Sequence, residues 1–458
     1  MKHTCFFSAL FLVFLTVITI GCKKDYLDIK PKGKVIPSSY KDYRLILNNT
    51  NDLLSSYGED ELATDNVEFY EAQGLSYLGN ISYKLHTWQD NVYTASDDDG
   101  EWGNLYKQIY LSNVVLDGMA SAKDGAERDR NQLIGEALVH RSFAYFSLVN
   151  IYGAQYDPAS SATDLGVPLL LVPDINAKLE RGSVKSVYDQ IFSDLTKATT
   201  LLETVSTSSY EPSLPAAYAM LARASLQITK FDDALKYASK ALELRNKLID
   251  YNNYTANPSS DFPQNRDNPE CIFIKTVSNS YSWFSVSKDL QNVFKSSQTD
   301  LRYQILFNST QEPFVGYPYY WGEFLSYDSR SVGLTVPEMY IIKAECEARA
   351  GMATEAMKDI NLLRVNRILK TEYEPLTAAT SDEALLKVLD ERRRELCFRG
   401  LRLFDLKRLN KEPRFAKILT HTYKGQQFEL KANDYRYQFP IALKYTNMNP
   451  ELVQNQRK

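Results

Sequence analysis

The sequence predicts a mainly α-helical fold in which antiparallel helix pairs form a scaffold that carries long loops and a few short strands. Apolar residues recur at helical spacing through most of the chain after residue 100. A two-helix repeat with small residues at its contact positions occurs twice. One copy contains Tyr218, Leu221, Ala222, Phe231, Ala234, Ala238 and Ala241, and the other contains Tyr340, Ala344, Gly351, Ala356, Ile360 and Leu363. Between the copies, residues 248–334 lose this periodicity and are rich in aromatic residues.

The first 21 residues have the build of an export signal that is removed from the mature protein. A basic start, Met1-Lys2-His3, precedes an apolar run from Phe6 to Ile20. This run is shorter than the roughly 20 residues that a membrane-spanning helix needs. We therefore favour a signal peptide at residues 1–21 over an uncleaved anchor helix.

Cys22 directly follows the predicted signal peptide. Thr19-Ile20-Gly21-Cys22 resembles a bacterial lipobox, with Thr19 in place of the usual leucine. We therefore expect Cys22 to be lipidated, and acyl chains contribute about 0.8 kcal/mol of membrane binding per buried methylene. Residues 22–38 mix proline, glycine and charged residues, so they are expected to form an extended tether.

Residues 39–458 are expected to form a single domain. The two-helix repeat resembles a tetratricopeptide repeat, in which small residues let two helices approach closely. Helix pairs are expected at about residues 101–151, 186–224, 213–245 and 335–368, the first two being degenerate copies. The first pair follows the acidic run Asp97-Asp98-Asp99-Gly100-Glu101. Calcium loops space their carboxylates at alternate positions, so we interpret this contiguous run as a helix cap instead.

The densest run of charge and apolar bulk is Asp390 to Leu409, within a closing segment at residues 381–458. Its three consecutive arginines suggest either a phosphate clamp or an ion-pair lattice. We favour the lattice, because acids alternate with the arginines and strong phosphate-binding sites keep one sign of charge. The expected pairs, four residues apart on one helix, are Asp390 with Arg394 and Glu395 with Arg399. Gly400 is expected to end this helix. Short strands are expected at Cys271–Ile274 and Tyr435–Ile441.

The composition argues against nucleic-acid binding, metal sites and catalysis. A formal net charge of -4 and a pI of about 5.8 make nucleic acid an unsuitable partner. No nucleophile elbow, phosphate-binding loop or zinc motif occurs, so we expect neither an enzyme nor a bound cofactor or metal. The remaining cysteines are expected to be buried free thiols, and the histidines are isolated in the sequence. These residues are Cys271, Cys346, Cys397, His86, His140 and His421.

The aromatic-rich segments offer candidate ligand-binding residues. Sugar binding needs flat apolar faces that stack on pyranose rings, together with planar polar groups for the hydroxyls. The candidate faces are Trp283, Tyr281, Trp321, Tyr319, Tyr320 and Trp88. The candidate polar partners are Asn279, Arg302, Asn292, Asp300 and Asn91. The alternative is that these aromatic side chains pack the loops onto the helices, because large aromatic residues are mostly buried.

Several segments together resemble the SusD/RagB family of outer-membrane lipoproteins of Bacteroidetes. They are Cys22 to Pro31, Trp102 to Leu116, Ala144 to Gly153, Gly166 to Leu169, Pro337 to Glu345, Glu391 to Leu409, and the ending from Tyr437 to Asn455. The resemblance covers nearly the whole chain through the order and spacing of these pieces. Two departures are the lipobox without leucine and Leu403, which stands where relatives often carry tryptophan.

The resemblance implies a fold of four tetratricopeptide-like helix pairs with loops and small strands on one side. It also implies a lipid-anchored position on the outer membrane, facing the cell exterior, and partnership with a SusC-like TonB-dependent transporter. The implied function is capture of an oligosaccharide and its delivery to that transporter. A peptide ligand in the same uptake system is the alternative, followed by a glycan-degrading enzyme or a pure protein-interaction scaffold.

Overall fold

The structure is a computed structural model of the chain, and it describes residues 37–69, 79–122, 124–277, 285–294, 299–310, 316, 318–322 and 330–457. The chain divides into two units, residues 1–38 and 39–458. The fold presented below is that of the second unit. Cys22, Asn279, Tyr281 and Trp283 lie outside the described residues.

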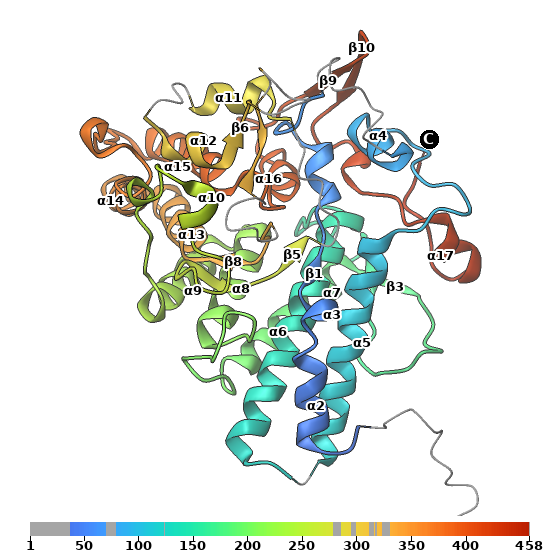
Figure 1. Cartoon of the computed structure of the whole chain (residues 1–458). Coiled ribbons are helices and arrows are strands. Elements are labelled where there is room, and N and C mark those ends of the chain that lie inside the picture. Colours follow the sequence, from blue (N-terminus) through green and yellow to red (C-terminus); the bar gives the residue numbers. More distant parts are fainter. Residues whose placement is uncertain are drawn as a thin grey trace, which may run out of the picture. The chain divides into compact units, whose positions relative to one another are not determined.

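The described body consists mainly of α-helices, which confirms the predicted fold class. The scaffold helices are α5 (Gly100–Ser121), α6 (Glu127–Tyr152), α7 (Val184–Ala198), α8 (Leu214–Gln227), α9 (Phe231–Leu244), α13 (Val336–Arg349), α14 (Ala353–Arg364), α15 (Ser381–Leu396) and α16 (Arg402–Leu409). Helix α5 packs on α6, α6 on α7, α8 on α9, and α13 on α14 (Figure 1). Helix α13 also packs on α9 and α15, so the scaffold continues past the insertion between α9 and α13. No helix in the described part of the chain is both long and apolar enough to cross a membrane.

Alanine residues allow helices α8 and α9 to approach each other closely, as the repeat predicts. The fully buried alanines are Ala216, Ala217, Ala219, Ala222 and Ala224 of α8, and Ala234, Ala238 and Ala241 of α9. A methyl side chain leaves little distance between two backbones, and it loses no rotamer freedom on burial. The same apolar cluster continues through α5, α6, α7 and α13 and forms the main core.

The N-terminal part of the body comprises α2 (Tyr40–Leu47), α3 (Thr50–Leu53), β1 (Ser55–Ser56), the 3-10 helix η2 (Glu59–Ala63) and α4 (Asn80–His86). Of these elements, α2, α3 and β1 pack on α5, whereas η2 contacts α16 and α4 contacts η2. Helix α2 lies against α5, where the ring of Tyr43 fills the space that a side chain at Gly118 would need. Asp99 caps α5 as predicted, because its carboxylate accepts a hydrogen bond of 3.1 Å from the main-chain N–H of Trp102.

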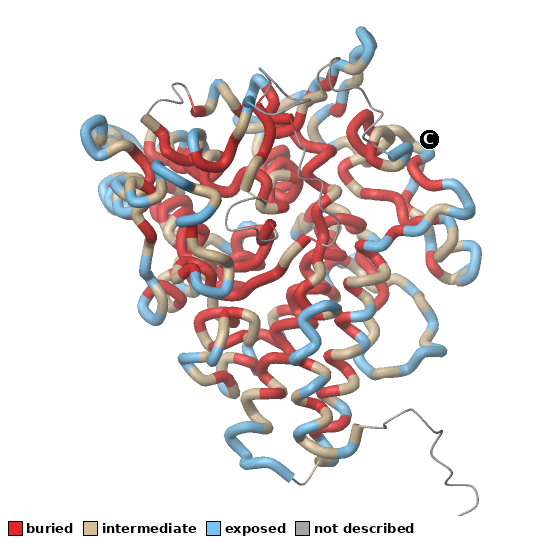
Figure 2. Tube along the Cα trace, in the orientation of Figure 1, coloured by how far each residue is buried: buried red, intermediate tan, exposed pale blue. Residues whose placement is uncertain are grey.

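The insertion has its own short elements and its own apolar cluster. Its elements are η5 (Tyr251–Asn253), α10 (Pro258–Asp261), β4 (Cys271–Phe273), β5 (Thr276–Val277), α11 (Lys288–Phe294), α12 (Leu301–Leu306), β6 (Phe307–Asn308), β7 (Tyr319–Tyr320) and β8 (Leu334–Thr335). The cluster includes Leu290 and Leu301 of the insertion together with Cys397 and Phe398, which directly follow α15. Buried residues of the insertion therefore pack against buried residues that follow α15. Figure 2 shows the buried residues in red.

The described strands form five two-stranded sheets. Strand β1 pairs with β5 in parallel, while β4–β8 and β6–β7 are antiparallel. The other antiparallel pairs are β2 (Leu165–Pro168) with β3 (Arg181–Ser183), and β9 (Leu419–Tyr423) with β10 (Gln426–Leu430). The remaining elements are η7 (Lys370–Glu372), η8 (Tyr435–Tyr437) and α17 (Leu443–Met448).

The structure confirms one predicted strand and corrects another. The strand expected at Cys271–Ile274 is β4, but the strand expected at Tyr435–Ile441 is wrong. This segment begins with the 3-10 turn η8, because the Asp434 carboxylate accepts a hydrogen bond of 2.9 Å from the main-chain N–H of Arg436. The β9–β10 hairpin lies in the closing segment at residues 381–458, where no hairpin was predicted from the sequence.

Helix α15 ends at Leu396 with Cys397 as its C-cap, so the predicted end at Gly400 is wrong, although Gly400 does adopt a left-handed conformation. Its φ is +65°, and a Cβ atom there would lie 2.7 Å from Cε2 of Tyr57. Gly351, between α13 and α14, has a φ of +88° but open space around the same position. A side chain at Gly351 would therefore cause backbone strain alone, whereas a side chain at Gly400 would cause both strain and steric overlap.

We expect Gly400→Ala to destabilise the protein more than Gly351→Ala does. Both changes place alanine in the left-handed region, which costs roughly 1–2 kcal/mol, and only the first also drives a methyl group into Tyr57. Urea unfolding of the two variants measures the difference. Equal losses would show that the Tyr57 side chain moves aside and that strain alone decides the effect.

Candidate functional site

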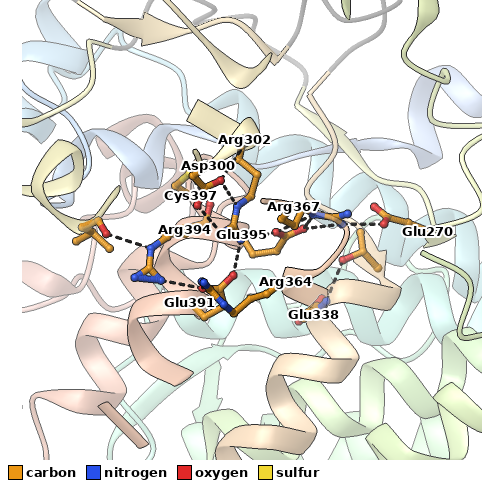
Figure 3. A network of polar contacts seen from close by, with 12 residues as sticks. Glu270, Asp300, Arg302, Glu338, Arg364, Arg367, Glu391, Arg394, Glu395 and Cys397 are labelled. Carbon is orange, nitrogen blue, oxygen red and sulfur yellow. Dashed lines mark hydrogen bonds and ion pairs between the residues drawn. The ribbon is translucent and has the colours of Figure 1, made fainter. Parts of the chain in front are cut away.

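The arginine-rich stretch forms a buried ion-pair network, which confirms the lattice interpretation (Figure 3). Arg302 of the insertion is fully buried and pairs with Asp300 at 2.7 Å, and with Glu391 and Glu395 of α15 at 2.8 Å each. Arg367 pairs with the same Glu395 at 3.0 Å and with Glu270 at 2.7 Å. The network thus joins α15, the end of α14 and the insertion.

The pairing partners on α15 differ from the expected ones. Arg394 pairs with Glu391 at 2.8 Å rather than with Asp390, which is exposed. Glu395 pairs with arginines from outside the helix rather than with Arg399. The carboxylates of Glu391 and Glu395 lie on the buried face of α15. There, arginines from other segments of the chain also pair with them. Burial by itself would raise the pKa of Glu391, but Arg302 and the neighbouring arginines hold this pKa below its ordinary value.

Arg302 was a candidate ligand-binding residue, and its contacts are structural. Its guanidinium donates to Asp300 through Nε and Nη2 and to Glu395 through Nη1, at 2.7–2.9 Å. Asp300 caps α12 by accepting from the main-chain N–H of Arg302 at 3.1 Å. Asn91 and Asn292, the other described polar candidates, are exposed. A contact between Arg302 and a ligand stays a prediction, which the variant Arg302→Ala can test.

The described aromatic candidates differ in burial. Trp88 is 4% exposed, and its indole Nε1 donates a hydrogen bond of 3.1 Å to the carbonyl oxygen of Ala63. Tyr319 and Tyr320 are buried, and the Tyr320 ring stacks on Phe398 with centroids 4.7 Å apart. Trp321 is half-buried and meets the Tyr319 ring edge-on at 5.8 Å. Trp88, Tyr319 and Tyr320 are buried by packing onto the body, and Trp321 packs against the apolar cluster of the insertion while staying partly exposed.

His86 and His421, which are far apart in the sequence, stack their rings on each other next to Trp88. The His86 and His421 rings have centroids 3.9 Å apart and an interplanar angle of 12°, and Trp88 stacks on the other side of His421 at 4.2 Å. Nδ1 of His421 lies 2.7 Å from the carbonyl oxygen of His86, and Nε2 lies 3.0 Å from that of Thr64. Burial and the neighbouring His421 lower the pKa of His86 well below its ordinary value. This contact could not be predicted from the sequence, since stacking of distant rings has no local pattern.

Cavities among the described residues include the following. The first, of about 460 Å³, lies between β9 and the segments around Val67 and Ser287, and we call it the β9 cavity. Its lining residues are Asp65, Val67, Glu68, Ser287, Lys288, Asp289 and residues 417–422. The second, of about 220 Å³, is lined by polar residues of α16 and the ending, such as Lys407 and Tyr437. The third, of about 40 Å³, includes Tyr320 and Arg399.

Charges of both signs form the floor of the β9 cavity. Asp65 is buried, and Arg402 binds its two carboxylate oxygens at 2.7 and 2.8 Å. Lys417 bridges Asp65 and Asp289, the latter at 3.2 Å. Burial would raise the pKa of Asp65, but Arg402, Arg393 and Lys417 together hold it well below its usual range. No group of three or more potential metal-ligating side chains occurs among the described residues.

Comparison with known proteins places both ends of the body in one family. The model of a family described as "Starch-binding associating with outer membrane" matches residues 25–226, and that of the "SusD family" matches residues 336–457. A SusD-like protein from Formosa agariphila is 22% identical over 483 residues, which cover 88% of this chain and 91% of the relative.

Solved structures share the fold. A SusD superfamily protein from Bacteroides thetaiotaomicron has a TM-score of 0.73 at 20% identity, covering 92% of this chain and 100% of its own. A SusD-like carbohydrate binding protein from Bacteroides vulgatus has a TM-score of 0.68 at 19% identity, covering 92% and 99%. At these identities, the similarity establishes the arrangement of the helices and not the ligand.

Proposed function

This chain belongs to the SusD/RagB family, and from this premise we propose that it captures an oligosaccharide and delivers it to a SusC-like TonB-dependent transporter. The proposal includes a lipid anchor at Cys22 that holds the body on the outer membrane, facing the cell exterior. The family description, which mentions starch binding and association with the outer membrane, supports this choice of ligand and location.

The position of the aromatic insertion carries the proposal. The two family matches end at residue 226 and resume at residue 336. The segment between them contains β4 to β8 and every aromatic candidate except Trp88, namely Tyr281, Trp283, Tyr319, Tyr320 and Trp321. An aromatic segment carried on a helical scaffold is an arrangement in which loops on a rigid support determine what is bound.

Within this segment we propose that Trp321, Tyr281 and Trp283 form the stacking surface, with Asn279 as a polar partner. Trp321 is half-buried, so part of its ring remains available to a pyranose face. The buried Tyr319 supports it edge-on from the β6–β7 pair. This support restricts the Trp321 ring before the ligand arrives, which reduces the entropy lost on binding.

Calorimetry of the soluble body, from about residue 25, against a panel of oligosaccharides tests this function. We expect saturable binding of one glycan class, at least tenfold weaker binding for Trp321→Ala and Trp283→Ala, and no change for Tyr110→Ala. Tyr110 is 38% exposed on α5, outside the insertion in the sequence, and serves as the matched aromatic control. Binding of no glycan would overturn the proposal, and release of a shortened glycan would indicate an enzyme instead.

A further inference from the structure

The hairpin β9–β10 leaves one strand edge without a partner. Its turn is Lys424-Gly425, with φ values of +47° and +71°, and Tyr423 pairs with Gln426 across it. In a hairpin with a two-residue turn, the pair beside the turn exchanges both hydrogen bonds and the following pairs alternate. The main-chain groups of Thr420 and Thr422 therefore point away from β10. No third strand joins this sheet in the described residues, and these two residues have no other hydrogen bond there.

This free edge borders the β9 cavity. The cavity touches every residue from Lys417 to Thr422 and none of β10. Along these residues, Leu419 and His421 are buried whereas Thr420 and Thr422 are exposed, so the strand's two faces both contribute. Neighbouring side chains of a strand point to opposite faces of the sheet. Because successive residues of β9 all line the cavity, the cavity runs along the edge of this strand.

The segment around Val67, which also lines the cavity, likewise has main-chain groups that point away from its pairing partner. The main-chain N–H of Glu68 donates to the carbonyl of Ser285 at 3.1 Å, and that of Ser287 donates to the carbonyl of Asn66 at 2.9 Å. Val67 pairs with Val286 between these two bonds, so its own N–H and C=O point away from Val286. Val67 also lines the cavity.

The β9 edge is held in place before any ligand binds. The His421 side chain contacts the carbonyls of His86 and Thr64 and stacks on Trp88, which fixes the strand against the body. On the outer edge of β10, Arg436 donates a hydrogen bond of 3.1 Å to the carbonyl oxygen of Glu429. On β9 there is no proline, charged residue or bulge of the kind that usually protects an exposed edge.

We propose that the β9 cavity binds a short peptide in extended conformation, which adds to β9 as a third strand. The free groups of Thr420 and Thr422 recur every second residue, about 6.8 Å apart, which is the repeat of an extended polypeptide. The cavity volume of about 460 Å³ lies in the range of roughly 300–1,000 Å³ typical of small-ligand pockets. Both signs of charge line it, so it can receive the amino and carboxyl ends of a peptide. This ligand is distinct from the oligosaccharide proposed above, and neither proposal depends on the other.

Substitution of the free edge by proline tests the proposal. Thr422→Pro removes an outward N–H but no hydrogen bond to β10, whereas Thr422→Ala keeps the N–H and removes the side chain. Gln427→Pro is the matched control, because Gln427 faces Thr422 and its N–H points to the other edge of the hairpin. Calorimetry with a mixed pentapeptide library, followed by single peptides from it, is expected to show at least tenfold weaker binding for Thr422→Pro alone.

A second measurement does not depend on the folding of any variant. Methylation of one main-chain nitrogen at a time along a bound pentapeptide is expected to weaken its binding to the unmodified protein at every second position. Side-chain recognition would not produce this period. The proposal is overturned if no peptide binds, if methylation has no such period, or if Thr422→Ala weakens binding as much as Thr422→Pro.

Glycan binding distinguishes this inference from the oligosaccharide proposal. Thr422→Pro is expected to leave glycan affinity unchanged, and Trp321→Ala is expected to leave peptide affinity unchanged. Loss of glycan binding in Thr422→Pro would instead assign the β9 cavity to the sugar and contradict a peptide there. Peptide binding without glycan binding would support the β9 site while overturning the proposed function.

Discussion

Replacing Arg302 with alanine is expected to lower the free energy of unfolding by about 3–5 kcal/mol, because the change leaves buried carboxylates without their cation. Arg302 is 0% exposed, and it pairs with Asp300, Glu391 and Glu395 at 2.7–2.8 Å. Arg364 and Arg394 still contact Glu391, and Arg367 still contacts Glu395. Asp300, however, would keep no cation from this network.

Urea unfolding measures this loss, and Asp390→Ala is the matched control on the same part of the chain. Asp390 lies on the exposed face of α15, so its removal should change stability by less than about 0.5 kcal/mol. Ligand affinity, measured below the unfolding transition, is expected to be retained in Arg302→Ala. If this variant kept its stability but lost ligand binding, Arg302 would belong to the binding site as the sequence suggested.

Replacing Asp60 with asparagine is expected to stabilise the protein increasingly as the pH rises from about 5 to 8. The Asp60 side chain is fully buried in η2, and neither carboxylate oxygen has a hydrogen-bond partner in the described part of the chain. Burial, with a smaller contribution from Glu61, raises the pKa of Asp60 to about 8, from an ordinary value of 3.8. Asparagine has nearly the same shape and cannot ionise.

The direction follows from proton binding in the two states. Between about pH 4 and 8, the folded protein keeps the Asp60 proton while the unfolded chain has released it, so folding becomes less favourable as pH rises. Each pH unit in this window corresponds to about 1.4 kcal/mol. The advantage of Asp60→Asn should therefore grow by about 3–4 kcal/mol between pH 5 and 8.

Urea titrations of both proteins at pH 5, 6, 7 and 8 measure this growth. Asp382→Asn provides the control, because the Asp382 side chain is 83% exposed and its removal should give a difference that is nearly independent of pH. A constant difference between Asp60→Asn and the original protein would show that Asp60 is already ionised in the folded state.

The scaffold could be predicted from the sequence because its signals are local. Apolar periodicity located α5 to α9 and α13 to α15, and small residues identified the α8–α9 contact. Asp99 marked the start of α5 through a main-chain preference that holds in any protein, whereas α15 ends at Leu396, before the predicted Gly400. The β9–β10 hairpin was also readable, since Lys424-Gly425 separates two alternating segments, but it was missed.

The candidate site could be predicted only in part, because burial of an aromatic ring depends on distant segments. Trp88 and Trp321 look equally suitable in the sequence, yet Trp88 is enclosed by His421 and Ala63 while Trp321 remains half-buried. In the sequence, Arg302 looked like a polar ligand contact. The fold places Glu391 and Glu395 beside it, and Arg302 forms ion pairs with both.

The sequence by itself determined that this protein is a helical repeat scaffold with an aromatic insertion and a closing segment rich in paired charges. Tertiary structure alone decided which charges pair, which aromatic rings stay accessible and which strand edge remains free. Helix periodicity and capping depend on neighbours within one or two turns, so they are written in short stretches of chain. The partners of Glu395 lie 28 and 93 residues away in the sequence, and the β9 cavity beside Thr422 is lined by the still more distant segment around Val67.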